Sequence, residues 1–368
     1  METLKYSESM KVDKQTVVIP FRFSCLPLKK LALINFEKKP DTHYIALEPQ
    51  YFDDLTYGHA YRVIAYRRDG YVDVYDDMNL MDDKDDSFDV TGKGLCERKK
   101  VGMEHTKFEK ENDQIFLSFQ FTDKYGRQIR VEITEHTSKK TNGINLLAPV
   151  GSSTENPSYL PLFFLYDFDF VRKRKTKAKV IIDGNPITID NFPYPLAKDF
   201  QLRYYTRYSE DCQIIEFANA TNEVLKEYTA DANRKVVSDS LEYQFGEDRS
   251  LEKILLKDSN HDLIVEFTGG FPDVRSLMNP SDFKGTFKIS ADEKMGYVSG
   301  EYSVRREDSS VTIELIPSDG WAAIPNSLFT KMMFSKKSLF CNWPKTYRYI
   351  QQINLTTLES SSRWERIK

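Results

Sequence analysis

The sequence has few of the residues that mark a metal centre or a disulfide scaffold. It contains 4 cysteines, 5 histidines and 3 tryptophans among 368 residues. Cys25, Cys96, Cys212 and Cys341 are far apart and form no CxxC pair, so we interpret them as reduced thiols of the core. The histidines form no HExxH or HxH pattern, so the sequence indicates no metal site. Reduced cysteines favour a cytoplasmic location.

Motifs for phosphate, dinucleotide or acyl chemistry are also missing. The sequence contains no P-loop, no GxGxxG turn and no GxSxG elbow, and we therefore expect no cofactor. Long apolar runs are absent as well, since none approaches the roughly 18 residues that a membrane helix needs. The stretch from Met1 to Phe21 lacks the apolar core of a secretory signal. These absences predict a soluble chain with no membrane span.

Neither sign of charge dominates. The chain has 52 basic and 56 acidic residues, well mixed, and a net charge of −4. This balance gives no general reason to expect nucleic acid or an anionic membrane as a partner. One basic run, Arg172–Lys175, is expected at the tip of a hairpin, where contact with solvent accounts for it.

Aromatic residues are plentiful, and apolar residues alternate with polar ones along most of the chain. The 24 Phe and 21 Tyr suit the half-buried surface of a sheet. Helical periodicity is limited to Asp273–Asn279 and to Ser327–Phe340, where Leu328, Met332 and Leu339 form an apolar stripe. Polar turns between alternating runs predict four hairpins: His59–Tyr75, Gln114–His136, Val180–Ile189 and Gly296–Pro317.

The expected fold is all-β, with about 18 to 20 strands and few short helices. That number is too large for one ordinary sheet and indicates two antiparallel β-barrel domains of the calycin or lipocalin type, or two sandwiches. Prolines interrupt the strand rhythm within Asp190–Asp199, so we place the domains at residues 1–190 and 191–368. Thr137–Pro157 is rich in Ser, Thr, Asn, Gly and Pro and is expected to be a loop.

The stretch FLYDFDFVRKRK, Phe164–Lys175, carries the most chemistry. On a strand, Asp167 and Asp169 share one face and lie roughly 7 Å apart, a separation that suits the two carboxylates of an inverting glycosidase. The aromatic residues share the other face and are expected in the core. The next strand brings Lys177 and Lys179 back alongside, and we favour ion pairs across this hairpin over a catalytic pair.

Other residues suggest catalysis or contact with a ligand. His136 ends an alternating strand and is a candidate general base, although an ordinary surface position accounts for it as well. Trp321 and Trp343 each lie near a strand end, with proline close by. A tryptophan in such a position either closes the core or stacks on a ligand, and we favour closing of the core.

The order of FFLYDFDF, VIIDGNPITI and GYVSGEYSVRREDSSVTIELIPSDGW resembles the double-barrel, lipocalin-like family that includes carotenoid hydratases and AttH-type proteins. The resemblance covers the middle and C-terminal parts of the chain. It implies two calycin-type barrels that hold an apolar ligand at a barrel mouth or between the barrels. Some members of that family hydrate double bonds or guide pericyclic reactions. The polar groups eligible for such a role are Tyr166, Asp167 and His136.

These features leave three functions open. In the first, a β-barrel binds a hydrophobic or amphipathic small molecule, with Tyr166, Phe168, Trp321 and Trp343 as its contacts. If that protein is an enzyme, a buried Asp167 with a raised pKa donates a proton, and His136 assists. The second is a carbohydrate-active or sugar-binding sandwich, which the scarcity of tryptophan disfavours. The third is a structural or interaction protein whose interior is filled by side chains. The oligomeric state stays open.

Overall fold

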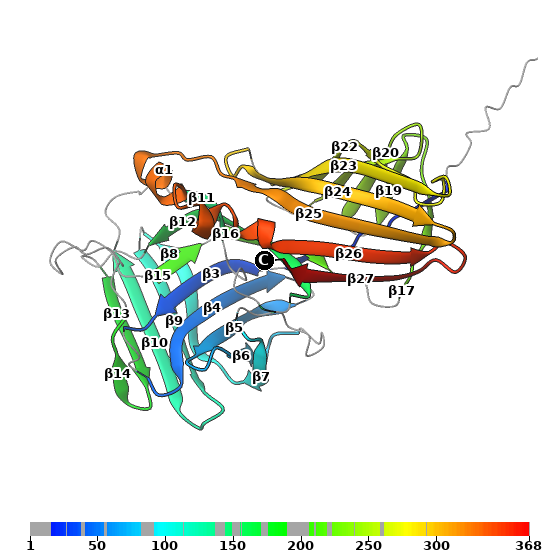
Figure 1. Cartoon of the computed structure of the whole chain (residues 1–368). Coiled ribbons are helices and arrows are strands. Elements are labelled where there is room, and N and C mark those ends of the chain that lie inside the picture. The colour runs from blue at the N-terminus through cyan, green and yellow to red at the C-terminus, as the bar shows by residue number, and fades with distance from the viewer. Residues whose placement is uncertain are drawn as a thin grey trace, which may run out of the picture.

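Strands make up most of the protein, as Figure 1 shows for its computed structural model. The structure describes residues 16–26, 28–37, 41–54, 57–81, 92–112, 114–136, 144–148, 155, 157–170, 176–189, 206–209, 211–218, 223–238, 240–257, 261–291 and 293–367. These residues form 27 strands, two α-helices and one 3-10 helix, which confirms the all-β class with few short helices. Within the same residues, no helix has the length and apolar character needed to cross a bilayer.

The first large sheet has 10 strands and contains most of the N-terminal half of the chain. In spatial order the strands are β2 (Phe23–Leu26), β16 (Asp211–Ala218), β12 (Tyr159–Phe170), β15 (Thr206–Ser209), β3 (Leu28–Asn35), β4 (Tyr44–Asp54), β5 (Gly58–Arg67), β6 (Val72–Asp77) and β7 (Leu95–Val101), with β11 (Ile144–Ala148) paired to β12. Strands β3 to β6 pack against a five-stranded sheet, and Val63, Phe119 and Val131 are fully buried between the two. The smaller sheet runs β14 (Asn185–Ile187), β13 (Thr176–Ile182), β10 (Gln128–His136), β9 (Gln114–Thr122) and β8 (Glu104–Glu111).

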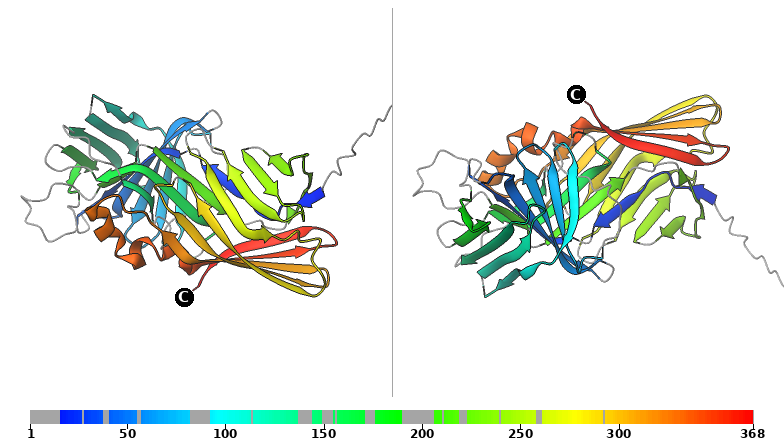
Figure 2. Two further views of the ribbon diagram at one scale, coloured as in Figure 1. Left: turned by 90° about the horizontal axis from the view of Figure 1, so that it is seen from above. Right: turned by 90° about the horizontal axis from the view of Figure 1, so that it is seen from below.

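The second large sheet, here called the C-terminal sheet, also has 10 strands. Its order is β17 (Glu223–Val224), β27 (Glu359–Arg366), β26 (Tyr347–Asn354), β25 (Ser310–Ala322), β24 (Tyr297–Glu307), β23 (Ser281–Ser290), β22 (Leu263–Phe271), β21 (Leu251–Leu256), β20 (Leu241–Phe245) and β19 (Lys235–Ser238). Figure 2 shows this sheet curving past the blue and green strands of the N-terminal half. A separate pair joins β1 (Thr16–Val18) to β18 (Glu227–Thr229). In the described part of the chain, neither large sheet pairs its last strand with its first, so the sheets are open and no barrel is closed.

All four predicted hairpins are present, because each pairs two alternating strands through one short turn. In β9 and β10, for example, Phe119 pairs with Val131, and both are fully buried. One register position in each of the other three is Val63 with Tyr75 in β5–β6, Val180 with Ile187 in β13–β14, and Val304 with Ile313 in β24–β25.

Several local expectations were wrong. Asp273–Asn279 forms a turn and not a helix, because the Asp273 side chain accepts hydrogen bonds from the Ser276 hydroxyl (2.7 Å) and the Arg275 N–H (3.2 Å). The expected loop Thr137–Pro157 contains a strand, β11. Strand β7 pairs with β6 in parallel, which the long connection of residues 78–94 permits. The number of strands, 27 in the described residues, is also larger than the expected 18 to 20. Strands as short as β17, with 2 residues, are too short to show alternation in the sequence.

The main core lies between the C-terminal sheet and segments from the start and middle of the chain. Phe21, which follows β1, lies 5.6 Å from Phe217 of β16 and 5.5 Å from Phe267 of β22, measured between ring centroids. The indole N–H of Trp364 in β27 donates to the Phe217 carbonyl at 2.8 Å. The domain boundary expected at residue 190 falls outside the described residues and stays a prediction. Strands on both sides of it share a sheet, since β16 pairs with β2 and β12.

Candidate functional site

Strand β12 contains the candidate acid Asp167 at an irregular point. Asp167 has a positive φ of 48° and is exposed, and the pairing with β11 shifts register between Ile144 and Leu146. This irregularity breaks the alternation that would set Asp167 beside Asp169, whose side chain lies outside the described residues. Asp167 is therefore not in the buried environment that its expected role as a proton donor assumed.

The neighbours of Asp167 belong to the core. Tyr166 is buried, and its ring stacks on the imidazole of His261 with a centroid distance of 3.5 Å. Its carbonyl accepts a hydrogen bond of 2.6 Å from the Ser209 hydroxyl. Phe168 is buried in the main core, and so is Leu165, which regular alternation would place on the same face as Asp167. Residues 160–166 are all buried, so both faces of β12 are covered up to Asp167, which is exposed.

The expected hairpin between β12 and the lysine-bearing strand does not form. Strand β13 pairs with β10 and β14, so Lys179 stands opposite Glu132 and Lys177 opposite Thr134. The described partners of β12 are β11, β15 and β16. The acidic residue that stands opposite Lys179 therefore comes from β10 and not from β12. The basic run Arg172–Lys175 lies outside the described residues.

The remaining candidate residues lie in other parts of the fold. His136 pairs with Gln114 at the end of the β9–β10 hairpin, and its side chain is not among those described. Trp321 and Trp343 are each 3% exposed and lie in the main core. The Trp321 indole N–H donates to the Met295 carbonyl at 2.9 Å. Tyr166 and Phe168 belong to the same main core as the two tryptophans, whereas Asp167 is exposed. A site that joins these residues stays a prediction.

The cysteines differ from one another more than we expected. Cys212 is buried and Cys341 partly buried, but Cys96 is exposed and is not a core thiol; none of these three cysteines forms a disulfide. Burial raises the pKa of the Cys341 thiol. Among the described residues, no group of three or more metal-ligating side chains could hold an ion.

A buried polar cluster joins the β9–β10 turn to β6. The hydroxyls of Tyr44 and Tyr75 lie 2.6 Å apart, and the Asp73 carboxylate accepts from Tyr44 at 3.2 Å and from the Lys124 ammonium at 2.7 Å. Burial raises the pKa of Tyr75 to about 12 and also raises that of Tyr44, so both hydroxyls keep their protons at neutral pH. These groups bind one another across two sheets and so hold the β9–β10 turn in position. We interpret the cluster as structural and not as catalytic.

Asp41 extends this cluster and fixes the start of β4. Its carboxylate accepts from the backbone N–H groups of His43 (2.8 Å) and Tyr44 (2.9 Å) and from the Arg127 guanidinium (2.8 Å). Burial of Asp41 favours the neutral acid, but the three hydrogen bonds outweigh burial and lower its pKa. Asp41 is thus a charged structural group and not a proton donor.

The segment between β25 and β26, residues 324–346, has a different character. We call it the helical segment; it contains α1 (Leu328–Phe334), α2 (Lys337–Phe340) and the 3-10 helix η3 (Trp343–Thr346). Figure 1 shows it at one end of the C-terminal sheet. Ser327 begins α1 with a capping box, in which its hydroxyl accepts from the Thr330 N–H and the Thr330 hydroxyl accepts from the Ser327 N–H. The helix expected over Ser327–Phe340 is confirmed, although it is divided into two.

One face of the helical segment is anchored to the core. Thr330 and Phe334, four residues apart on α1, are its buried residues. The ring of Phe334 packs edge-to-face on Trp321 at 5.0 Å and on Phe340 at 5.9 Å. The backbone N–H of Trp321 donates to the Cys341 carbonyl at 2.8 Å. Trp321 therefore anchors the helical segment to the C-terminal sheet through its ring and its backbone.

The opposite face presents large apolar side chains to solvent. Leu328 is 88% exposed, Leu339 52% and Met332 50%, with Ile324 and Phe329 at 48% and 40%. The stripe found in the sequence thus points outward. Scattered single apolar residues are normal at a protein surface, but several within one short segment mark an interaction site.

The charges that accompany these side chains are all positive. Lys331, Lys336, Lys337 and Lys345 are exposed within the helical segment. From Gly320 to Leu358 the sequence contains no aspartate or glutamate, although the whole chain has a net charge of −4. The segment therefore combines an apolar surface with local positive charge. The net charge of the whole chain does not show this local excess of lysine. The net charge counted over a window of one helix and its flanking residues would have shown it.

No family model, curated protein or solved structure matches this chain. The resemblance to the double-barrel family therefore stays a prediction.

Proposed function

We propose that this protein binds the surface of anionic lipid membranes through its helical segment. The observation that carries the proposal is the exposure of Leu328, Phe329, Met332 and Leu339 among lysines, with no carboxylate nearby in the sequence. Short amphipathic helices of this composition lie in the membrane interface, with the apolar side chains among the acyl chains and the lysines at the head groups.

The free energy of such binding can be estimated by adding the contributions of the lysines and of the apolar side chains. Each lysine near an anionic surface contributes about 1 kcal/mol, so the four lysines contribute about 4 kcal/mol at moderate ionic strength. Insertion of a half-exposed apolar side chain contributes about 1 kcal/mol, since full burial of such a side chain is worth about 1.5 to 3 kcal/mol. Neither contribution alone gives stable attachment. Their sum supports reversible, salt-sensitive binding.

A hydrophobic ligand enclosed by the strands is the alternative inferred from the sequence. The described interior of the C-terminal sheet is occupied by the protein's own aromatic rings, including Phe21, Phe217 and Phe267. Space for an enclosed ligand would require these rings to move, whereas the helical segment offers its apolar surface without rearrangement. A cytoplasmic location, inferred from the cysteines, agrees with the proposal because the cytoplasmic leaflet is rich in anionic lipids.

Vesicle co-sedimentation tests the proposal. The wild type is expected to bind vesicles containing phosphatidylserine and to stay in solution with pure phosphatidylcholine, because the lysines need a negative surface. The variant Lys331→Gln/Lys336→Gln/Lys337→Gln should bind about 100-fold more weakly, which corresponds to about 3 kcal/mol. Raising the salt to about 1 M, where charges are screened within about 3 Å, should weaken the wild type in the same direction.

A matched control separates local from total charge. Lys99→Gln/Lys226→Gln/Lys284→Gln removes three exposed lysines elsewhere, so both triple variants change the net charge from −4 to −7. The control should bind like the wild type. Equal loss in the two variants, or no binding of the wild type to anionic vesicles, would refute the proposal.

A further inference from the structure

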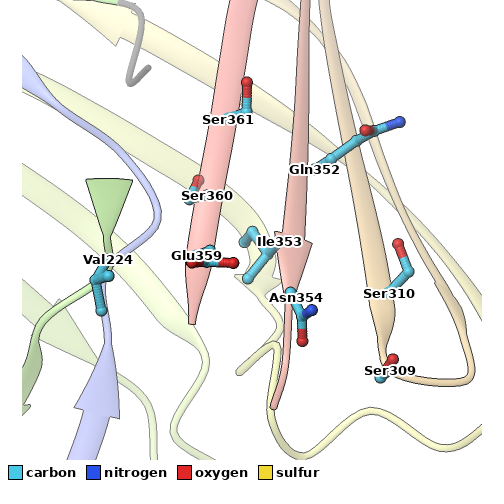
Figure 3. Close-up of a pocket in the computed structure, with 9 residues that line it drawn as sticks. All are labelled: Val224, Ser309, Ser310, Gln352, Ile353, Asn354, Glu359, Ser360 and Ser361. Carbon is cyan, nitrogen blue, oxygen red and sulfur yellow. The ribbon is translucent and has the colours of Figure 1, made fainter. Parts of the chain in front are cut away.

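A groove of about 400 Å³ lies at the end of the C-terminal sheet that is farthest from the helical segment. It forms where the β24–β25 turn, the β26–β27 turn and β17 meet, and Figure 3 shows the side chains around it. Strand β25 runs from Ser310 at the groove to Ala322 beside the helical segment, a length of about 40 Å at about 3.3 Å per residue. A protein attached to a membrane by the helical segment therefore presents this groove to water.

The groove is lined by neutral polar side chains. Exposed hydroxyls come from Ser309, Ser310 and Ser361, and exposed amides come from Gln352 and Asn354. A fourth lining serine, Ser360, is buried. Strand pairing places them in facing pairs, since Ser310 stands opposite Asn354, and Gln352 opposite Ser361. Directly opposed side chains on antiparallel strands lie about 5 Å apart, so each pair can engage one ligand.

Two other lining residues add an acceptor and an apolar side chain. Among the described lining residues, Glu359 is the one carboxylate, and its Oε2 accepts from the Thr357 hydroxyl at 3.2 Å. Val224 of β17 is 62% exposed and adds an apolar side chain, whereas Ile353 is 1% exposed and belongs to the core. The described lining contains no lysine, arginine or histidine, so an anionic ligand would meet a carboxylate and no cation there.

The turn beneath the groove is held by its own hydrogen bonds. The Asn354 Oδ1 accepts from the N–H groups of Thr356 (2.9 Å) and Thr357 (3.3 Å). The Leu358 N–H donates to the Asn354 carbonyl at 2.7 Å, and the Leu355 N–H donates to the Ser309 carbonyl at 2.7 Å. These contacts tie the β24–β25 and β26–β27 turns together, so the two sides of the groove keep their spacing.

We propose that this groove binds a neutral polyhydroxylated ligand of the saccharide class, an activity separate from membrane binding. Hydroxyls and amides both donate and accept, which matches the hydroxyls of a sugar, and the Glu359 carboxylate is an acceptor suited to a pair of them. The exposed Val224 side chain offers an apolar contact for the C–H face of the ring. The volume falls in the lower part of the range of about 300 to 1,000 Å³ found for small-molecule sites, which fits one or two sugar units. The described lining residues include no aromatic platform, so we expect weak binding, with a dissociation constant on the order of 1 mM.

Saturation-transfer NMR on the full-length protein, with a panel of neutral mono- and disaccharides, tests the inference. At least one saccharide is expected to show transfer and a dissociation constant on the order of 1 mM. Ser361→Trp fills the groove from an exposed strand position and should weaken that binding at least about tenfold. Glu359→Gln should weaken it about fivefold to tenfold, because a charged acceptor becomes neutral.

Glu301→Gln is the matched control, since Glu301 is exposed on β24 of the same sheet but does not line the groove. It should bind the saccharide like the wild type. The inference is overturned if no neutral saccharide shows transfer, if Ser361→Trp binds as well as the wild type, or if phosphate esters or polyamines bind more tightly than every sugar. Vesicle binding should be unchanged in Ser361→Trp, so the two proposals fail independently.

Discussion

Replacing Leu328 by serine should weaken vesicle binding strongly without affecting the fold. Leu328 is 88% exposed, so almost none of its side chain contributes to the core. Substitutions at such positions usually change the free energy of unfolding by less than about 0.5 kcal/mol. Transfer of a leucine side chain from water into the interface is worth about 2 kcal/mol. Because about 1.4 kcal/mol is a factor of ten, Leu328→Ser should lower the vesicle partition coefficient about 30-fold.

The matched control for this variant is Met278→Ser. Met278 is 80% exposed, so its loss removes a comparable amount of apolar surface. It lies next to Asn279, whose side-chain amide donates to the Asp308 carboxylate at 3.2 Å, and thus at the end of the sheet opposite the helical segment. The assay is co-sedimentation with phosphatidylserine-containing vesicles, with urea unfolding as the measure of stability. Equal losses of vesicle binding in the two variants, or none in Leu328→Ser, would show that the helical segment does not contact the membrane.

Two further predictions concern stability. Phe21→Ala should lower the free energy of unfolding by about 3 to 5 kcal/mol, because the buried ring of Phe21 packs on Phe217 and Phe267. Urea titration measures this change. A loss below about 1 kcal/mol would mean that the segment after β1 is not part of the main core. Asp41 has a pKa below its ordinary value of 3.8, so its ionised form stabilises the folded state above that pH, and this contribution is lost as the pH falls through the folded-state pKa. The stability difference between the wild type and Asp41→Asn should accordingly be largest near pH 7 and shrink below pH 3.8, and a difference that does not vary with pH would exclude the role.

The sequence by itself determined the local architecture of this protein. Alternation with a period of two predicted the all-β class and the four hairpins, because two strands joined by a short turn have their register set by neighbouring residues. Helical spacing likewise predicted the helix over Ser327–Phe340, and the capping residues Ser327 and Thr330 are local too. These features need no knowledge of distant segments.

Only the tertiary structure decided which faces are covered. Period-two alternation cannot show that β12 pairs with β16 and not with β13, because the choice of partner depends on segments tens of residues away. The same limit applies to burial, since Leu165 is covered on the face that its acidic neighbours marked as exposed. In the helical segment, periodicity identified the stripe of Leu328, Met332 and Leu339, but these side chains are exposed. The buried residue is Phe334, whose ring packs against Trp321. The stripe faces outward because the space beneath the segment is already filled, and that depends on packing between distant parts of the chain.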